Sequence, residues 1–362
     1  MRLIIVFLVI CCVGCTQKVR YVFTLQGDIR GIKYGKAFLI DPTDSARILY
    51  TVEIDGGKFK IDGELDEPGL FILKVNRQQF YFFMDGENMF VTGEYSKLTN
   101  RNVKGSPAND LDELYKDIER KQYHTVKNAL LSEYRTAMRA GNQKLANEKL
   151  TEVLKTDEIQ YRLAEDFVKK YPDNIYSSYI ANIVKGESYE EGQVLYNLLS
   201  KENQQSRYGK LLKQETDALA VSALGVPCPD FTATDESGNK VSMASQKGGI
   251  MVLDFWASWC GPCRQEMKNL REQYAEFKDQ GVRFMSISLD DSVEKWKKAC
   301  EEEQIPWISV RDDNGWSKSE IRKLFGIQAI PFIVLLDKDG NIVAKNIRRN
   351  SLREKILELL QK

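Results

Sequence analysis

Two cysteines separated by two residues give this sequence its clearest chemical signal. They belong to the motif Trp-Cys-Gly-Pro-Cys at residues 259–263. An apolar run that predicts a buried strand precedes the motif, and a charged stretch at helical spacing follows it. Cys260 is therefore expected in the first turn of a helix, where unpaired N–H groups favour a thiolate over a thiol. Cys263, one turn further on, can reach Cys260.

This arrangement predicts a centre that makes and breaks disulfide bonds. Cys260 would attack a partner disulfide to form a mixed disulfide, which Cys263 would resolve by attacking Cys260. Pro262 lacks an N–H group that would be unpaired at that position anyway. Cys263 is expected to be the more buried of the two cysteines, and the chemistry needs no cofactor.

The resolving step requires a base for Cys263. The chain has a single histidine, His124, which nearly excludes Cys–His and Ser–His pairs and histidine-rich metal sites. Asp254 lies inside the apolar run, six residues before Cys260. A buried carboxylate has a raised pKa, so Asp254 could take the proton from Cys263 directly or through water. The alternative is a carboxylate that points to solvent or caps a neighbouring element.

A Cys-x-x-Cys pair can also be half of a zinc site, which needs two further ligands. Beyond the first 15 residues, the cysteines outside the motif are Cys228 and Cys300, which form no second close pair. The Trp-flanked Gly-Pro insertion is typical of redox centres, so no metal is expected. Cys228 and Cys300 could pair with each other or act as redox relays, but packing as small apolar residues is the simpler interpretation.

The composition is that of a globular protein. The 362 residues allow two or three domains, and 43% of them are hydrophobic and 29% charged. Lys+Arg and Asp+Glu both number 52, so no net field attracts a polyanion. We therefore expect no nucleic-acid partner.

The N-terminus predicts export from the cytoplasm. A basic residue precedes an apolar run at residues 3–13, far shorter than the roughly 20 residues of a membrane-spanning helix. Residues 1–14 resemble a bacterial lipoprotein signal, which implies that Cys15 becomes the lipidated first residue, with a tether at residues 15–20. Cys12 stands where that pattern prefers an aliphatic residue. An uncleaved anchor and a plain secretory signal are the alternatives.

The rest of the chain has three patterns, which predict a multidomain α+β protein. Residues 21–104 contain short strands with turn signals and predict an antiparallel β-sandwich. Residues 105–218 have apolar side chains at helical spacing, best explained by packing between helices. Residues 219–362 alternate strands and helices, which predicts an α/β domain. Its expected strands are 249–255, 282–289 and 332–336, and its expected helices are 263–278, 293–303 and 351–360.

This last part resembles thioredoxin and, within the AhpC/TSA–thioredoxin superfamily, the TlpA/ResA-like branch of exported thiol-disulfide oxidoreductases. The similarity rests on Gly-Val-Pro-Cys-Pro-Asp-Phe at 225–231, the Trp-Cys-Gly-Pro-Cys centre, and Gly-Ile-Gln-Ala-Ile-Pro at 326–331. It implies a thioredoxin fold from about residue 224 onward and a cis Ile330–Pro331 peptide opposite the cysteines. The substrate-binding residues that it implies are Trp259, Gly261, Pro262, Ile330 and Pro331.

Three positions depart from the family's pattern. Lys268 stands where the active-site helix usually carries a kinking proline, which removes a bend and adds a positive charge. Phe332 follows the expected cis-proline, where a small hydroxyl residue is common. Cys228 stands where alanine is usual.

The resemblance implies a lipid-anchored enzyme of the bacterial cell envelope that faces the periplasm. It would reduce disulfides in exported proteins, with those of cytochrome c maturation as one candidate class, and would need a membrane electron donor or acceptor. A disulfide isomerase or oxidase and a peroxidase are alternatives of the same fold. Peroxidatic cysteines follow a Pro-x-x-x-Thr/Ser-x-x pattern, and residues 255–260 lack its proline. A non-enzymatic lipoprotein that binds an envelope ligand through its N-terminal regions is a further alternative.

Overall fold

The computed structural model describes residues 20–43, 46–186, 188–246 and 248–361. Cys15 and the predicted signal at residues 1–14 lie outside the described residues. The chain divides into two compact units, residues 1–163 with 173–177, and residues 164–172 with 178–362. The domain boundaries expected from the sequence stay predictions.

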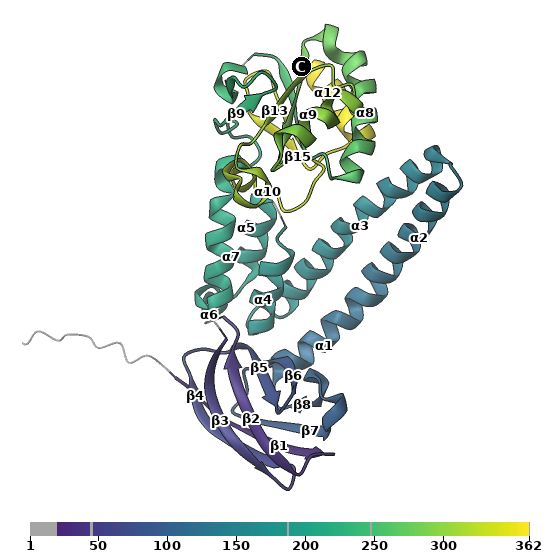
Figure 1. Cartoon of the computed structure of the whole chain (residues 1–362). Coiled ribbons are helices and arrows are strands. Elements are labelled where there is room, and N and C mark those ends of the chain that lie inside the picture. The colour runs from purple at the N-terminus through teal and green to yellow at the C-terminus, as the bar shows by residue number, and fades with distance from the viewer. Residues whose placement is uncertain (1–19, 44–45, 187, 247, 362) are drawn as a thin grey trace, which may run out of the picture. The chain divides into compact units, whose positions relative to one another are not determined.

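The first unit contains one eight-stranded sheet (Figure 1). Its strand order is β6-β5-β2-β3-β4-β1-β7-β8. The strands are β1 (Tyr21–Arg30), β2 (Tyr34–Asp41), β3 (Arg47–Asp55), β4 (Lys58–Leu65), β5 (Gly69–Val75), β6 (Gln78–Met84), β7 (Asn88–Glu94) and β8 (Val103–Lys104). A tight turn at Gly56 and Gly57, both of which adopt positive φ angles, joins β3 to β4.

The predicted β-rich domain is present, but its β-sandwich detail is not confirmed, because these strands form a single, nearly closed, barrel-like sheet. The two halves of this sheet, β6-β5-β2-β3 and β4-β1-β7-β8, are joined where β3 pairs with β4 at Asp55 and Lys58. Alternate side chains of β1 point into one core inside the curve. Turn residues predict the hairpins, but they do not identify long-range pairing partners.

Helices fill most of residues 107–218, as predicted. They are α1 (Pro107–Glu119), α2 (Thr125–Arg139), α3 (Gln143–Lys170), α4 (Ile175–Val184), α5 (Tyr189–Leu198), α6 (Lys201–Gln205) and α7 (Arg207–Ala218). α1 begins where the Ser106 side chain accepts a hydrogen bond from the Asn109 N–H, with Pro107 in the first turn. Within the described ranges, no helix is long and apolar enough to cross a membrane.

The second unit contains a seven-stranded sheet of order β10-β9-β13-β12-β11-β14-β15. The strands are β9 (Thr232–Asp235), β10 (Lys240–Ser242), β11 (Ile250–Trp256), β12 (Val282–Ser288), β13 (Ile308–Arg311), β14 (Phe332–Leu336) and β15 (Ile342–Lys345). Every residue of β11 is buried, because this strand lies between β12 and β14 and is covered on both faces. The three strands expected in this part match β11, β12 and β14 to within one residue at either end.

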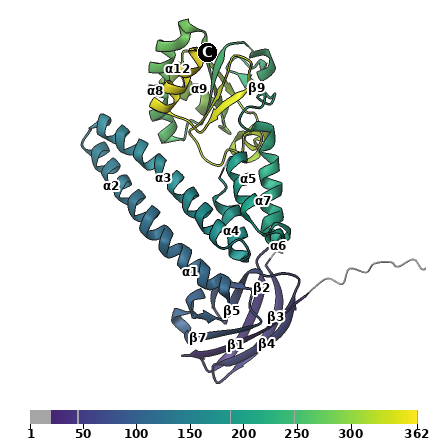
Figure 2. The same cartoon turned by 180° about the vertical axis from the view of Figure 1, so that it is seen from behind.

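Helices cover both faces of this sheet. They are α8 (Gly261–Phe277), α9 (Val293–Glu302), α10 (Gly315–Lys318), α11 (Glu320–Leu324) and α12 (Arg349–Leu360). α8, α9 and α12 share one core with the sheet, through Met267, Trp296 and Leu352. α11 contributes Ile321 to the core on the other face. Figure 2 shows α8 and α12 side by side, and α8 runs without interruption through Lys268, where the family's kinking proline is absent.

Candidate active site

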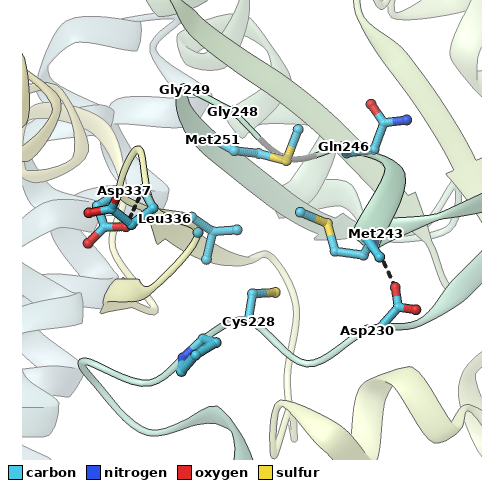
Figure 3. A pocket seen from close by; sticks show the side chains of 13 residues that line it. Cys228, Asp230, Met243, Gln246, Gly248, Gly249, Met251, Leu336 and Asp337 are labelled. Carbon is cyan, nitrogen blue, oxygen red and sulfur yellow. Dashed lines mark hydrogen bonds between the residues drawn. The ribbon is translucent and has the colours of Figure 1, made fainter.

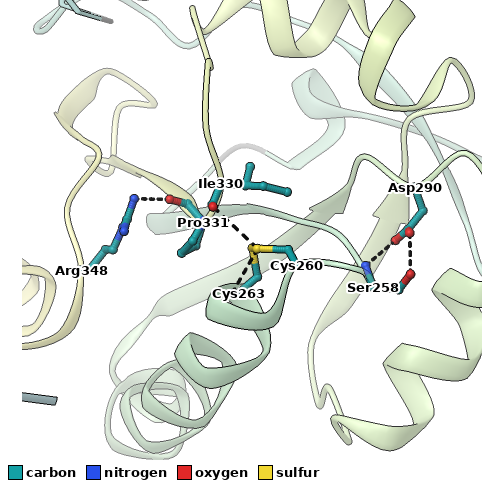
Figure 4. The surroundings of a disulfide bond; sticks show 7 residues. All are labelled: Ser258, Cys260, Cys263, Asp290, Ile330, Pro331 and Arg348. Carbon is teal, nitrogen blue, oxygen red and sulfur yellow. Dashed lines mark hydrogen bonds between the residues drawn. A yellow bond between two sulfur atoms is a disulfide. The ribbon is translucent and has the colours of Figure 1, made fainter. Parts of the chain in front are cut away.

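The two motif cysteines form a disulfide at the start of α8 (Figure 4). Cys260 is the residue that caps the helix, and its Sγ accepts a hydrogen bond from the Cys263 N–H at 3.2 Å. The predicted helix started at Cys263, whereas α8 begins at Gly261. Cys263 is 1% exposed and Cys260 is 5% exposed, so Cys263 is the more buried of the two cysteines, as predicted.

A buried carboxylate that the sequence analysis missed fixes the loop before Cys260. Asp290, directly beyond β12, accepts hydrogen bonds from the Ser258 N–H at 2.8 Å and the Ser258 hydroxyl at 2.6 Å (Figure 4). The Ser288 hydroxyl donates to the same carboxylate at 2.8 Å. The carboxyl ends of parallel strands meet at one edge of a sheet, and β12 is the parallel neighbour of β11. An aspartate just after β12 could therefore have been predicted to lie near the cysteine loop. Asp290 thus positions the loop that carries Cys260.

We predict that Asp290→Ala destabilises the oxidised protein by roughly 3 kcal/mol, because it leaves a half-buried N–H and two hydroxyls without an acceptor. Urea unfolding followed by fluorescence measures this change. The control is Asp279→Ala, which removes an exposed aspartate of the same unit. A difference below about 1 kcal/mol between the two variants would contradict the positioning role.

The cis-proline segment lies against the disulfide. The Ile330–Pro331 peptide is cis, as the resemblance implies. The Ile330 carbonyl oxygen lies 3.6 Å from Cys260 Sγ, and Arg348 donates a hydrogen bond to the Pro331 carbonyl (Figure 4). The structure therefore brings a carbonyl 70 residues further along the chain to the Cys260 sulfur atom. The substrate-binding roles of Trp259, Gly261, Pro262, Ile330 and Pro331 stay predictions.

Asp254 is a buried carboxylate of β11, the strand that leads into the cysteine loop. Its side chain is 2% exposed, so it does not point to solvent. The Ser286 hydroxyl donates a hydrogen bond to it at 3.0 Å. Burial raises the pKa of Asp254 to about 7, the negative charge of Glu266 adds to the rise, and Ser286 and Arg348 oppose it. A carboxyl group with this pKa can both accept and release a proton near neutral pH.

Glu266 is a second buried carboxylate that the sequence analysis missed. It lies in α8, one turn beyond Cys263, and is almost fully buried. The Arg349 N–H donates to it at 3.3 Å, the Arg349 guanidinium lies 3.4 Å away, and Asn269 donates at 3.2 Å. Its position next to Met267, on the apolar side of the helix, could have indicated that this glutamate is buried. The negative charge of Glu266 contributes to the raised pKa of Asp254.

Cys228 and Cys300 are free cysteines, so the prediction that they might pair is not supported. Cys228 faces a pocket that Met243, Met251 and Leu336 also line (Figure 3). Burial raises the pKa of both Cys228 and Cys300 to about 12, so both thiols stay protonated at neutral pH and are poor nucleophiles. Among the residues that the structure describes, no group of three or more His, Cys, Asp or Glu side chains could hold a metal ion.

Comparisons with known proteins point to the same chemistry. Residues 224–345 match the AhpC/TSA family, and residues 23–111 match a domain of unknown function, DUF4369. Thiol-disulfide oxidoreductase ResA of Bacillus thuringiensis subsp. konkukian is 30% identical over 139 residues, 38% of this chain and 78% of that protein. ResA of Geobacillus thermodenitrificans is 28% identical over 146 residues, 40% of this chain and 80% of that protein. A solved thiol-disulfide oxidoreductase from Bacteroides fragilis is 32% identical, with 37% of this chain and 99% of that chain covered and a TM-score of 0.35.

Proposed function

Since this chain belongs to the AhpC/TSA family and is a thiol-disulfide oxidoreductase, we propose that it works as a reductase of disulfide bonds in exported proteins. The observation that carries the proposal is the Cys260–Cys263 pair at the start of α8, in the same unit as a buried carboxyl group with a pKa of about 7. The Gly-Pro pair between the cysteines and the buried Asp254 are thioredoxin-like features, which favour reduction over oxidation.

The proposed reaction starts from the dithiol. The Cys260 thiolate attacks one sulfur of the partner's disulfide, which breaks as the Cys260–partner bond forms, and the leaving sulfur takes up a proton. Cys263 gives its proton to Asp254, directly or through water, and attacks Cys260. The Cys260–Cys263 disulfide forms as the bond between Cys260 and the partner breaks, and the partner's second sulfur leaves as a thiolate that takes up the proton held by Asp254. Two electrons and two protons pass to the partner, and a membrane donor must then restore the dithiol.

The reduction potential of the Cys260–Cys263 pair tests the direction of this reaction. The purified protein is equilibrated with dithiothreitol or glutathione buffers, and the fraction of disulfide is measured after acid quenching. Thioredoxin lies near about −270 mV and the oxidant DsbA near about −120 mV. We expect a value at or below about −240 mV, and a value above about −160 mV would support an oxidase or isomerase instead.

We also propose that lipidated Cys15 holds the enzyme on a membrane of the cell envelope, facing the periplasm. The residues that support this are the short apolar run and the small residues before Cys15. Disulfide-containing exported proteins would be its partners, and the cysteines of cytochromes c under maturation are one such class. In this proposal the N-terminal regions act as a spacer or docking module.

Cys15→Ser is expected to move the protein from the membrane fraction to the soluble fraction of cells, because it removes the acylated thiol. Fractionation and mass spectrometry of the mature N-terminus measure this change. Cys12→Ser is the matched control, since it changes a neighbouring cysteine that the signal does not acylate. If mass spectrometry finds no acyl group on Cys15 of the membrane-bound wild type, the lipid anchor is wrong.

A further inference from the structure

Two tryptophan rings meet at a right angle beside the redox cysteines. Trp259 directly precedes Cys260 and is 56% exposed, an unusual exposure for so large a side chain. Its ring centroid lies 5.8 Å from that of Trp316, and the two planes are 87° apart. The two indoles form a corner, which we call the indole corner, next to the reactive sulfur.

The corner is held in place from its Trp316 side. The Arg322 guanidinium lies 4.8 Å from the centre of the Trp316 ring, and Arg322 also donates to the Ile327 carbonyl at 2.8 Å. Gly315, directly before Trp316, has φ of +62°, and a Cβ there would lie 1.9 Å from an Asp291 carboxylate oxygen. The backbone therefore places Trp316 at this point, so the corner exists before any partner binds.

The reaction at Cys260 determines which part of a partner protein can contact the indole corner. A partner's sulfur must come within bonding distance of Cys260 Sγ, and consecutive residues of an extended chain lie about 3.5 Å apart. The Ile330 carbonyl, 3.6 Å from Cys260 Sγ, bounds the approach on one side. The residue next to the partner's cysteine then lies within reach of Trp259, which directly precedes Cys260.

We propose that the indole corner binds a large apolar or aromatic side chain adjacent to the reactive cysteine of an extended segment in the partner protein. Covering the exposed face of Trp259 removes apolar surface from water, and a second ring can pack against the two indoles. The enzyme would thus prefer protein disulfides with such a neighbour over glutathione disulfide, which has none. This inference rests on the proposed reductase function and adds a specificity determinant, Trp316, to it.

The test uses two peptides, each closed by one internal disulfide, that differ only in Phe or Ser beside one cysteine. Pre-reduced full-length protein reacts with each in a single turnover, and the peptide thiols are quantified after acid quenching. We expect wild type to reduce the Phe peptide about tenfold faster than the Ser peptide. Trp316→Ala should bring this ratio close to one, and Trp316→Phe should keep most of it. Val293→Ala, which removes another exposed apolar side chain of this unit, is the matched control and should keep the full ratio.

Three outcomes would overturn the inference. Wild type could show no preference between the peptides, or Trp316→Ala could keep the wild-type ratio. Trp316→Ala could also slow both peptides equally and shift the reduction potential of the cysteine pair, which would make Trp316 a structural residue. Glutathione disulfide separates the two proposals, because a wild type that reduces it without peptide preference refutes only the indole corner. A wild type that reduces no disulfide refutes the reductase function as well.

Discussion

Replacing Cys263 with serine is expected to trap the protein covalently on its partners. Cys260 keeps its place at the start of α8, so it can still attack a disulfide. A serine hydroxyl cannot displace the partner from Cys260, so the mixed disulfide persists. Turnover should fall by at least roughly a thousandfold, and non-reducing gels and intact-mass spectra should show one partner chain per protein.

Two matched variants control this experiment. Cys260→Ser should neither turn over nor trap partners, because the attacking sulfur is gone. Cys300→Ser should turn over like wild type, since burial raises the pKa of this thiol to about 12 and it is not part of the disulfide. Trapping by Cys260→Ser, or normal turnover by Cys263→Ser, would reverse or abolish the proposed roles of the two cysteines.

The trapped species also tests the substrate proposals in cells. Mass spectrometry of the adducts identifies the partner cysteines and the residues beside them. Exported proteins among the adducts would support the proposed reductase, and cytoplasmic proteins alone would contradict it. An excess of large apolar residues beside the trapped cysteines would agree with the indole corner.

Features that depend on nearby residues could be predicted from the sequence. The apolar run before the motif predicts a strand buried on both faces, and all seven residues of β11 are buried. This burial is also what made Asp254 recognisable, because a carboxylate inside such a run has no route to solvent. The position of Cys260 at the N-terminal end of a helix followed from the same junction of strand and helix, although the predicted helix began two residues later than α8.

Features that depend on long-range pairing could not be predicted. Asp290 reaches Ser258 across 32 residues only because β11 and β12 pair in register. In the first unit, β1 pairs in parallel with β7, a strand from the other end of the β-rich segment, and no turn signal predicts that pairing. Trp316, which contacts Trp259, lies in the segment between β13 and β14. The helices of that segment are too short to show a helical spacing of apolar residues in the sequence.

Asp254→Asn is expected to make the protein more stable at alkaline pH. The pKa of this aspartate is about 7 in the folded protein, against roughly 3.9 for an aspartate in an unfolded chain. The folded state therefore holds the proton more tightly, and the free energy of unfolding falls as pH rises from about 4 to about 7 and then levels off. Asparagine does not titrate, so the variant should gain up to about 4 kcal/mol over wild type at pH 8.5.

Urea unfolding of the oxidised protein between pH 4.5 and 8.5 measures this difference. Glu272→Gln is the control, since it removes an exposed carboxylate of α8 and should follow the wild-type curve. Parallel curves for Asp254→Asn and wild type would show that Asp254 titrates at an ordinary aspartate pKa. The Asp254→Asn gain should disappear towards pH 4.5, where the wild-type carboxyl is protonated in the folded state.

The same substitution should slow the release of the partner from Cys260. An ionised Asp254 takes the proton from Cys263 in the proposed mechanism, so the wild-type release rate should rise through an inflection near pH 7. Asp254→Asn removes that base and should slow release about a hundredfold at pH 7 without the inflection. Well above pH 8 a growing fraction of Cys263 ionises unaided, so the two rates should converge. A variant that gains alkaline stability but keeps the wild-type release profile would show that Asp254 is buried at a cost to stability and takes no proton from Cys263.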